Sequence, residues 1–89
     1  MTTPPSILLV CIGNRVRSPL AQGFLRAELD SAGLTHVRVD SAGTNVWPGG
    51  EPPEREAIFE AARAGVDIAH LRSRELTEAD FDNHDQVLA

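Results

Sequence analysis

The pattern of apolar and polar positions predicts strands and helices that alternate along the chain. Residues 7–10, Ile-Leu-Leu-Val, form an unbroken apolar run, as in a strand buried on both faces. From Ser18 to Gly33 the apolar residues recur at helical spacing, with Pro19 suited to the first helical position behind a Ser18 N-cap. Further elements are expected at residues 37–41 (strand), 54–64 (helix, ended by Gly65), 76–80 (helical turn behind a Thr cap) and 86–89 (strand).

The order of these elements indicates an α/β fold. Strand, helix and strand follow one another within ~35 residues, which makes a βαβ unit with parallel strands and a right-handed crossover. Residues 45–53 are rich in Pro and Gly and are expected to form a loop. Because the last expected strand stops at Ala89 with nothing to cover it, we expect residues 1–89 to be a single, incomplete domain.

Composition and charge exclude several classes of function. The 89 residues carry 8 basic and 13 acidic side chains, a net charge of −5, and no Lys/Arg run, so no nucleic-acid partner is expected. No apolar run is long enough for a signal sequence or a membrane span, and a cytoplasmic protein is expected. The single cysteine excludes an internal disulfide and a Cys-rich zinc site, and neither a metal nor a cofactor is expected.

The chemistry of the chain is expected in the turn from the first strand into the first helix. Here Cys11 is followed, after five residues, by Arg17 and Ser18. Backbone N–H groups in such a turn, together with the helix dipole, favour a tetrahedral dianion and stabilise a thiolate. Arg17 offers a planar fork for two phosphate oxygens, Gly13 permits a close approach of the backbone, and Asn14 tolerates a left-handed conformation.

One plainer interpretation competes with this one, and part of the motif is weak evidence when taken alone. A lone cysteine is more often a buried core residue, and a bare Cys-x5-Arg match is a weak signal. The extended string Cys-x-Gly-Asn-x-x-Arg-Ser-Pro, however, falls at the strand-to-helix turn that the chemistry requires. The functional interpretation is therefore favoured.

Over nearly its whole length the sequence resembles the low-molecular-weight protein tyrosine phosphatases. Besides the turn, the resemblance rests on five segments or residues: Asp40 to Thr44, Trp47, Pro52 with Arg55, Arg72 to Thr77, and Asp80-Phe81 with Asp85 to Ala89. It implies a three-layer α/β fold with a doubly wound parallel sheet in the strand order 2-1-3, from which the family's fourth strand is absent. The site then lies at the carboxyl ends of the strands.

The resemblance also assigns roles to residues. Cys11 is the nucleophile, Arg17 binds the phosphate and Ser18 stabilises the thiolate. Ser41 fixes Asn14 and thereby the loop. The phosphate-binding amides are those of Ile12, Gly13, Asn14, Arg15, Val16 and Arg17, and Trp47 is a wall for an aromatic ring unless it only covers the edge of the core.

Three departures from the family pattern are visible. Val16 stands where many members have a second cysteine, so no disulfide can protect Cys11. A histidine usually supports the loop after the second helix; His70 is near that place, but in one alignment Leu71 stands there instead. The general-acid aspartate of the family belongs to a later loop, and Asp80, Asp82 and Asp85 do not replace it.

The sequence thus predicts hydrolysis of phosphotyrosine proteins or small aryl phosphates through a phosphocysteine intermediate. The alternative is an oxyanion- or phosphoprotein-binding module that is catalytically impaired because it lacks the general acid. An arsenate reductase is less favoured because one cysteine leaves no resolving thiol, and a nucleotide-binding P-loop is less favoured still, since no Gly-Lys-Ser/Thr is present. The exposed last strand also predicts a homodimer through the edge of the sheet.

Overall fold

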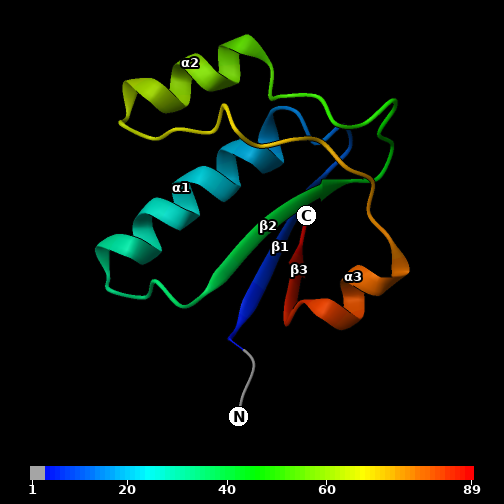
Figure 1. Ribbon diagram of the computed structural model, residues 1–89, viewed down its shortest axis with the longest axis horizontal. Helices are drawn as coiled ribbons and strands as arrows, with labels where there is room; N and C mark the ends of the chain where they lie inside the picture. The colour runs from blue at the N-terminus through cyan, green and yellow to red at the C-terminus, as the bar shows by residue number, and fades with distance from the viewer. Residues whose placement is uncertain (1–3) are drawn as a thin grey trace.

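The computed structural model describes residues 4–89, so residues 1–3 of the expected domain lie outside the described part. Three parallel strands form one sheet in the order β2-β1-β3, as predicted. Figure 1 shows the sheet with α1 along one face, α2 beyond it and α3 near β3. The elements are β1 (Ser6–Cys11), α1 (Arg17–Ser31), β2 (Arg38–Gly43), α2 (Arg55–Arg63), α3 (Glu78–Asn83) and β3 (Gln86–Leu88).

The register of the sheet brings the ends of β1 and β2 together. Cys11 pairs with Gly43, and the pairing continues beyond the strands, because the Thr44 N–H donates to the carbonyl of Cys11 (3.0 Å) and the Asn45 N–H to that of Ile12 (2.9 Å). β3 pairs with β1 only over Ile7 to Leu9. The carboxyl end of β1 therefore lies where the turn into α1 begins, the usual site position in open parallel sheets.

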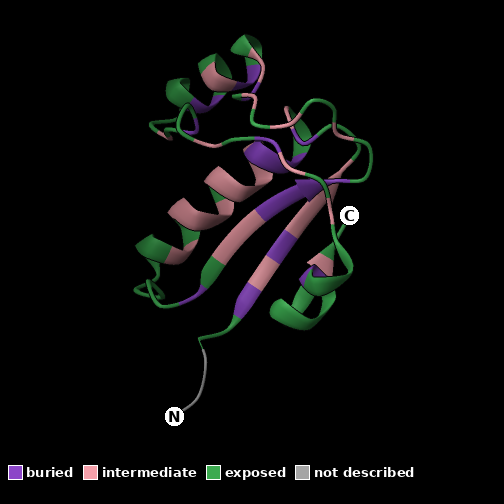
Figure 2. Cartoon of the chain, turned by 45° about the vertical axis from the view of Figure 1, so that its right-hand side comes forward, coloured by how far each residue is buried: buried purple, intermediate pink, exposed green. Residues whose placement is uncertain are grey.

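Most of the buried apolar residues lie in two places. Leu8 and Ala42 are fully buried in the sheet, whereas Ala57, Ala61 and Ile68 form a cluster between α1, α2 and the segment after α2. Figure 2 shows α1 as mostly half-buried, and only Ser18 and Pro19 are buried in it. The packing of α1 is thus tightest at its first turn, next to the predicted site.

The helix ends agree with the sequence after α1, after α2 and at the Thr77 cap, but α3 continues to Asn83, beyond the predicted turn of residues 76–80, and the start of α1 differs. Gly33 and Gly65 adopt the left-handed conformation, with φ of 78° each, directly after the C-caps. Thr77 and Asp80 form a capping box at α3. The predicted Ser18 N-cap is wrong: the helix begins at Arg17, its N-cap is Val16, and the Ser18 hydroxyl hydrogen-bonds within the turn instead of capping.

Candidate active site

Cys11 ends β1 with its sulfur inside the turn. The Sγ atom lies 3.0 Å from the Ser18 Oγ and accepts a hydrogen bond from the Asn14 N–H at 3.2 Å. Burial opposes ionisation of the thiol, but hydrogen bonds from Ser18 and Asn14 and the charge of Arg17 outweigh it, and the pKa of Cys11 is lowered. The turn therefore favours the thiolate, which is the nucleophilic form.

Asn14 is the centre of the turn. It is 2% exposed and adopts φ 56°, the left-handed conformation that asparagine tolerates better than most residues. Its Nδ2 donates to the Ser18 Oγ (2.8 Å) and to the Ser41 Oγ (3.0 Å), and its Oδ1 accepts from the backbone N–H of Arg74 (2.9 Å). One side chain thus ties the turn to α1, β2 and the segment before α3.

The hydrogen bond between Asn14 and Ser41 that the resemblance implies is present, and it continues further. The Ser41 Oγ donates to the Gln22 Oε1 at 2.7 Å, and the Gln22 Nε2 donates to the carbonyl of Val39 at 3.2 Å. Sequence reasoning did not find Gln22, because a glutamine in the middle of a helix carries no local signal for a partner on a neighbouring strand.

Gly43 allows β2 to approach the turn. A Cβ atom at this position would lie 2.5 Å from the Ile12 carbonyl oxygen and 3.0 Å from the Asn14 nitrogen, distances at which the turn would have to move. At Gly13, by contrast, nothing lies within 4 Å of the place that a Cβ atom would take, so close packing against the protein is not what requires a glycine there.

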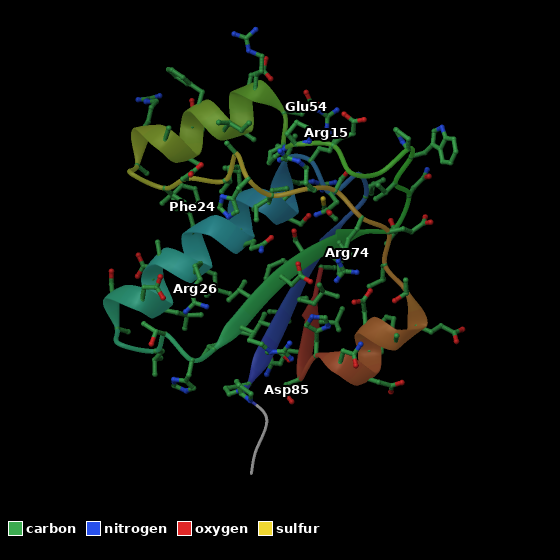
Figure 3. All side chains as sticks on the ribbon, viewed as in Figure 1. Arg15, Phe24, Arg26, Glu54, Arg74 and Asp85 are labelled. Atoms are coloured by element: carbon green, nitrogen blue, oxygen red, sulfur yellow. The ribbon has the colours of Figure 1, made fainter. Side chains whose placement is uncertain are left out.

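Arg15 and Arg17 make different contacts as they leave the turn. Arg15 donates through Nε to the carbonyl of Pro52 (2.9 Å) and pairs with Glu54 (3.2 Å). Figure 3 labels Arg15 and Glu54 near the start of α2. Arg17 is exposed, and its side chain makes no hydrogen bond or ion pair with any other residue of 4–89. Its guanidinium is free to bind a ligand, whereas that of Arg15 holds the turn to the start of α2.

A cavity of about 530 Å³ opens beside Cys11. Its wall is mainly apolar, and Arg17 is the one charged side chain on it within the described chain; the lining residues are Leu9, Val10, Cys11, Ile12, Arg17, Ser18, Ala21, Thr44, Leu88 and Ala89. Trp47 does not line this cavity and is 91% exposed, so it does not cover the edge of the core.

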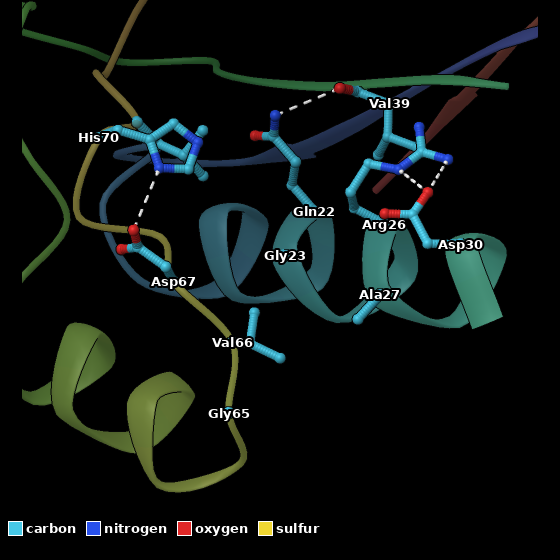
Figure 4. Close-up of a pocket in the computed structure, with 11 residues that line it drawn as sticks. Gln22, Gly23, Arg26, Ala27, Asp30, Val39, Gly65, Val66, Asp67 and His70 are labelled. Carbon is cyan, nitrogen blue, oxygen red and sulfur yellow. Dashed lines mark hydrogen bonds and ion pairs between the residues drawn. The ribbon is translucent and has the colours of Figure 1, made fainter. Parts of the chain in front are cut away.

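The structure does not bring His70 to the turn. His70 is exposed, and its Nδ1 lies 3.9 Å from the Asp67 Oδ2 in a cleft between α1 and the segment after α2 (Figure 4). Leu71, the alternative in the other alignment, packs against the Ala57 cluster. No hydrogen bond or ion pair within residues 4–89 gives His70 the loop-supporting role; the backbone N–H of Arg74 holds Asn14 instead.

Residues 4–89 contain neither a membrane-spanning helix nor a cluster of metal-binding side chains. No helix there is both long and apolar enough to cross a membrane. The same residues contain no group of three or more His, Cys, Asp or Glu side chains placed to hold a metal ion.

Comparisons with known proteins show the family to which the chain is similar. The family model described as "Low molecular weight phosphotyrosine protein phosphatase" matches residues 6–89. The protein of that name from Schizosaccharomyces pombe is 36% identical over 91 residues, covering 100% of this chain and 58% of the relative. The low molecular weight protein-tyrosine-phosphatase of Streptomyces coelicolor is 40% identical over 86 residues, covering 93% and 51%.

The solved structures give the same result. The crystal structure of YfkJ from Bacillus subtilis superimposes with a TM-score of 0.92 at 32% identity, covering 97% of this chain and 55% of that one. The chain thus spans between about half and three fifths of the length of the relatives it matches. From the family model, the sequence relatives and the shared fold, this chain belongs to the low-molecular-weight phosphotyrosine protein phosphatase family.

Proposed function

We propose that this chain binds and cleaves phosphate monoesters of phenols, phosphotyrosine among them, through a phosphocysteine intermediate. The observation that carries the proposal is the Cys11 sulfur, held by Ser18 and Asn14 with a lowered pKa beside the free guanidinium of Arg17. The family membership supports the same chemistry.

In the first step, the Cys11 thiolate attacks phosphorus, an Sγ–P bond forms, and the P–O bond to the phenol breaks. Arg17 and the backbone amides of Ile12, Gly13, Asn14, Arg15 and Val16 bind the equatorial oxygens as charge develops on them. In the second step, water attacks phosphorus, the Sγ–P bond breaks, and phosphate leaves. The Ser18 hydroxyl stabilises the sulfur as it departs.

Without a general acid the phenol leaves as phenolate and takes its proton from solvent water. No Asp or Glu lines the Cys11 cavity within residues 4–89. Asp80 is held in an ion pair with Arg74, and Asp85 accepts a hydrogen bond from the Ser6 N–H (2.8 Å). General acid catalysis typically contributes ~10²- to 10⁴-fold, so this chain should react with activated aryl phosphates and far more slowly with alkyl phosphates.

Trp47 is the proposed wall for the substrate ring. Its exposed indole can stack on an aromatic phosphoester, although it does not line the cavity in this structure. We further propose a cytoplasmic protein that acts without a metal or other cofactor, and we assign residues 1–89 to a single phosphotyrosine phosphatase domain.

The experiment measures the turnover of an aryl phosphate, the burst of phenol in the first turnover, and the protection of Cys11 from alkylation. Wild type should release a burst of phenol from para-nitrophenyl phosphate, Cys11→Ser should release none, and phosphate or vanadate should slow alkylation of Cys11. Arg17→Lys should weaken the protection by vanadate, whereas Arg63→Lys at the last residue of α2 should not, because Arg63 pairs only with Glu60 within residues 4–89. Protection without a burst indicates the binding module instead, and turnover by Cys11→Ser overturns the proposal.

A further inference from the structure

An ion-pair cluster lies next to the turn but outside the cavity. The Arg74 guanidinium donates to both carboxylate oxygens of Asp80, through Nη1 at 3.0 Å and through Nη2 at 2.9 Å, and through Nη2 also to the Asp40 Oδ2 at 2.9 Å. Arg74 is labelled in Figure 3 between the end of β2 and α3. A bidentate pair with a third partner fixes a guanidinium far better than a single surface contact does. We call these three residues the Arg74 cluster.

Each carboxylate of the cluster is itself held. Asp80 is 5% exposed and accepts from the Thr77 N–H (2.8 Å) and hydroxyl (3.1 Å), and its pKa is lowered chiefly by the hydrogen bonds from Arg74. The Asp40 Oδ1 accepts from the Ser41 N–H at 2.8 Å, and the hydroxyl of the same serine binds Asn14. The cluster is therefore anchored to α3 on one side and to β2 on the other.

The backbone of Arg74 links this cluster to the turn. Its N–H donates to the Asn14 Oδ1 (2.9 Å), and its carbonyl accepts from the Gly43 N–H (2.9 Å). Asn14 in turn donates its own N–H to the Cys11 sulfur. An unbroken series of contacts thus connects a salt bridge on α3 with the nucleophile.

We propose that the Arg74 cluster is a positioning device for Cys11, in which the guanidinium fixes the Arg74 backbone so that Asn14 is held in its left-handed conformation with its N–H on the sulfur. The proposal rests on the nucleophilic role proposed for Cys11. It assigns Arg74 no contact with substrate, since neither Arg74 nor its partners line the Cys11 cavity.

The test uses the thiol itself, because Cys11 is the only cysteine of the chain and its alkylation reports thiolate directly. The rate of reaction with iodoacetamide is measured from pH 5 to 10. In Arg74→Met the rate at acidic pH should fall about two- to tenfold, the equivalent of weakening one hydrogen bond, while the plateau at alkaline pH stays unchanged. Arg74→Lys, which keeps the charge but not the fork, should fall between Met and wild type.

Arg26→Met is the matched control. Arg26 is also a half-buried arginine, paired with Asp30 and donating to the carbonyls of Val37 and Leu34, but no hydrogen bond within residues 4–89 connects it with Asn14. It should lose stability and keep the native alkylation profile. A folded Arg74→Met protein with the native profile overturns the proposal.

If circular dichroism shows that the Arg74→Met protein is unfolded, the alkylation test is made with Asp40→Asn instead. It removes the charge of Asp40 and one of its two acceptor oxygens, so that a single oxygen is left for the Ser41 N–H and Arg74, while the Asp80 pair stays. A loss of about twofold at acidic pH is expected; an unchanged profile again overturns the proposal. The proposed function fails in a different way, namely when the wild-type thiol already titrates like free cysteine.

Discussion

Replacement of Asn14 by alanine tests whether one buried amide holds the phosphate-binding turn. The substitution removes the two hydrogen bonds that Nδ2 donates to Ser18 and Ser41, and the one that Oδ1 accepts from the Arg74 N–H. It also places alanine at φ 56°, where a side chain without a local hydrogen bond is strained. No new contact replaces these, because Asn14 is buried.

The expected loss follows from these contacts. Three hydrogen bonds contribute ~0.5–1.5 kcal/mol each, and alanine in the left-handed region costs about 1 kcal/mol more than asparagine. The Asn14→Ala protein should therefore lose about 2.5 to 5.5 kcal/mol of unfolding free energy, a large share of the ~5–15 kcal/mol typical of a domain. With a slope of ~2 kcal/mol per M of urea, the midpoint of unfolding should fall by about 2 M.

Urea unfolding followed by circular dichroism measures this loss. Asn14→Gly removes the same hydrogen bonds but relieves the backbone strain, so it should be about 1 kcal/mol more stable than Asn14→Ala. Asn45→Ala, in the exposed loop after β2, is the control and should change stability by less than about 0.5 kcal/mol. An Asn14→Ala protein within about 1 kcal/mol of wild type would refute the reasoning.

Three further predictions concern β2, α3 and the sheet edge. Gly43→Ala should destabilise the fold by about 1–3 kcal/mol and abolish vanadate protection of the thiol, since its Cβ meets the Ile12 carbonyl; full protection would contradict this. The Asp80 pKa is lowered by Arg74, so its contribution is present above the unfolded pKa of ~3.9 and is lost as the pH falls towards the folded value. Asp80→Asn should accordingly flatten the decline of the urea midpoint between pH 5 and 2, and an equally steep decline would argue against the pair. The predicted homodimer through β3 (Gln86–Leu88) should elute at twice the monomer mass with light-scattering detection, and a monomer at high protein concentration would rule it out.

The fold could be predicted from the sequence because its signals are local. The apolar run of β1, the helical spacing of α1 and the glycines after α1 and α2 each depend on residues a few positions apart. The capping box at Thr77 and Asp80 is equally local. The strand order is implied by the family resemblance alone, because no local pattern indicates which strands are neighbours.

The supports of the site could not all be predicted, because they join residues that are far apart in the chain. Arg74 and Asp40 are 34 positions apart, and the bond from the Arg74 N–H to Asn14 spans 60 positions. For Ser18 two roles were predicted, a cap of α1 and a contact with the thiolate; its hydroxyl lies against the Cys11 sulfur and the Asn14 amide but does not cap the helix. For His70 the family resemblance leaves two positions open, His70 and Leu71. In the structure His70 lies beside Asp67, and it is Leu71 that packs against the buried cluster.

The turn combines groups that are unfavourable when taken alone. Burial opposes the thiolate, and the left-handed Asn14 is strained. Both are held because α1, β2 and the segment at Arg74 meet at Asn14, whereas β3 contributes no hydrogen bond to the turn within the described chain. The geometry of the phosphate-binding turn should therefore depend on the α1 and β2 side of the sheet, whereas the rate of phenol release depends on the source of the proton that the phenol receives. The two steps can then be separated experimentally, with vanadate protection reporting the first and the dependence on leaving-group pKa reporting the second.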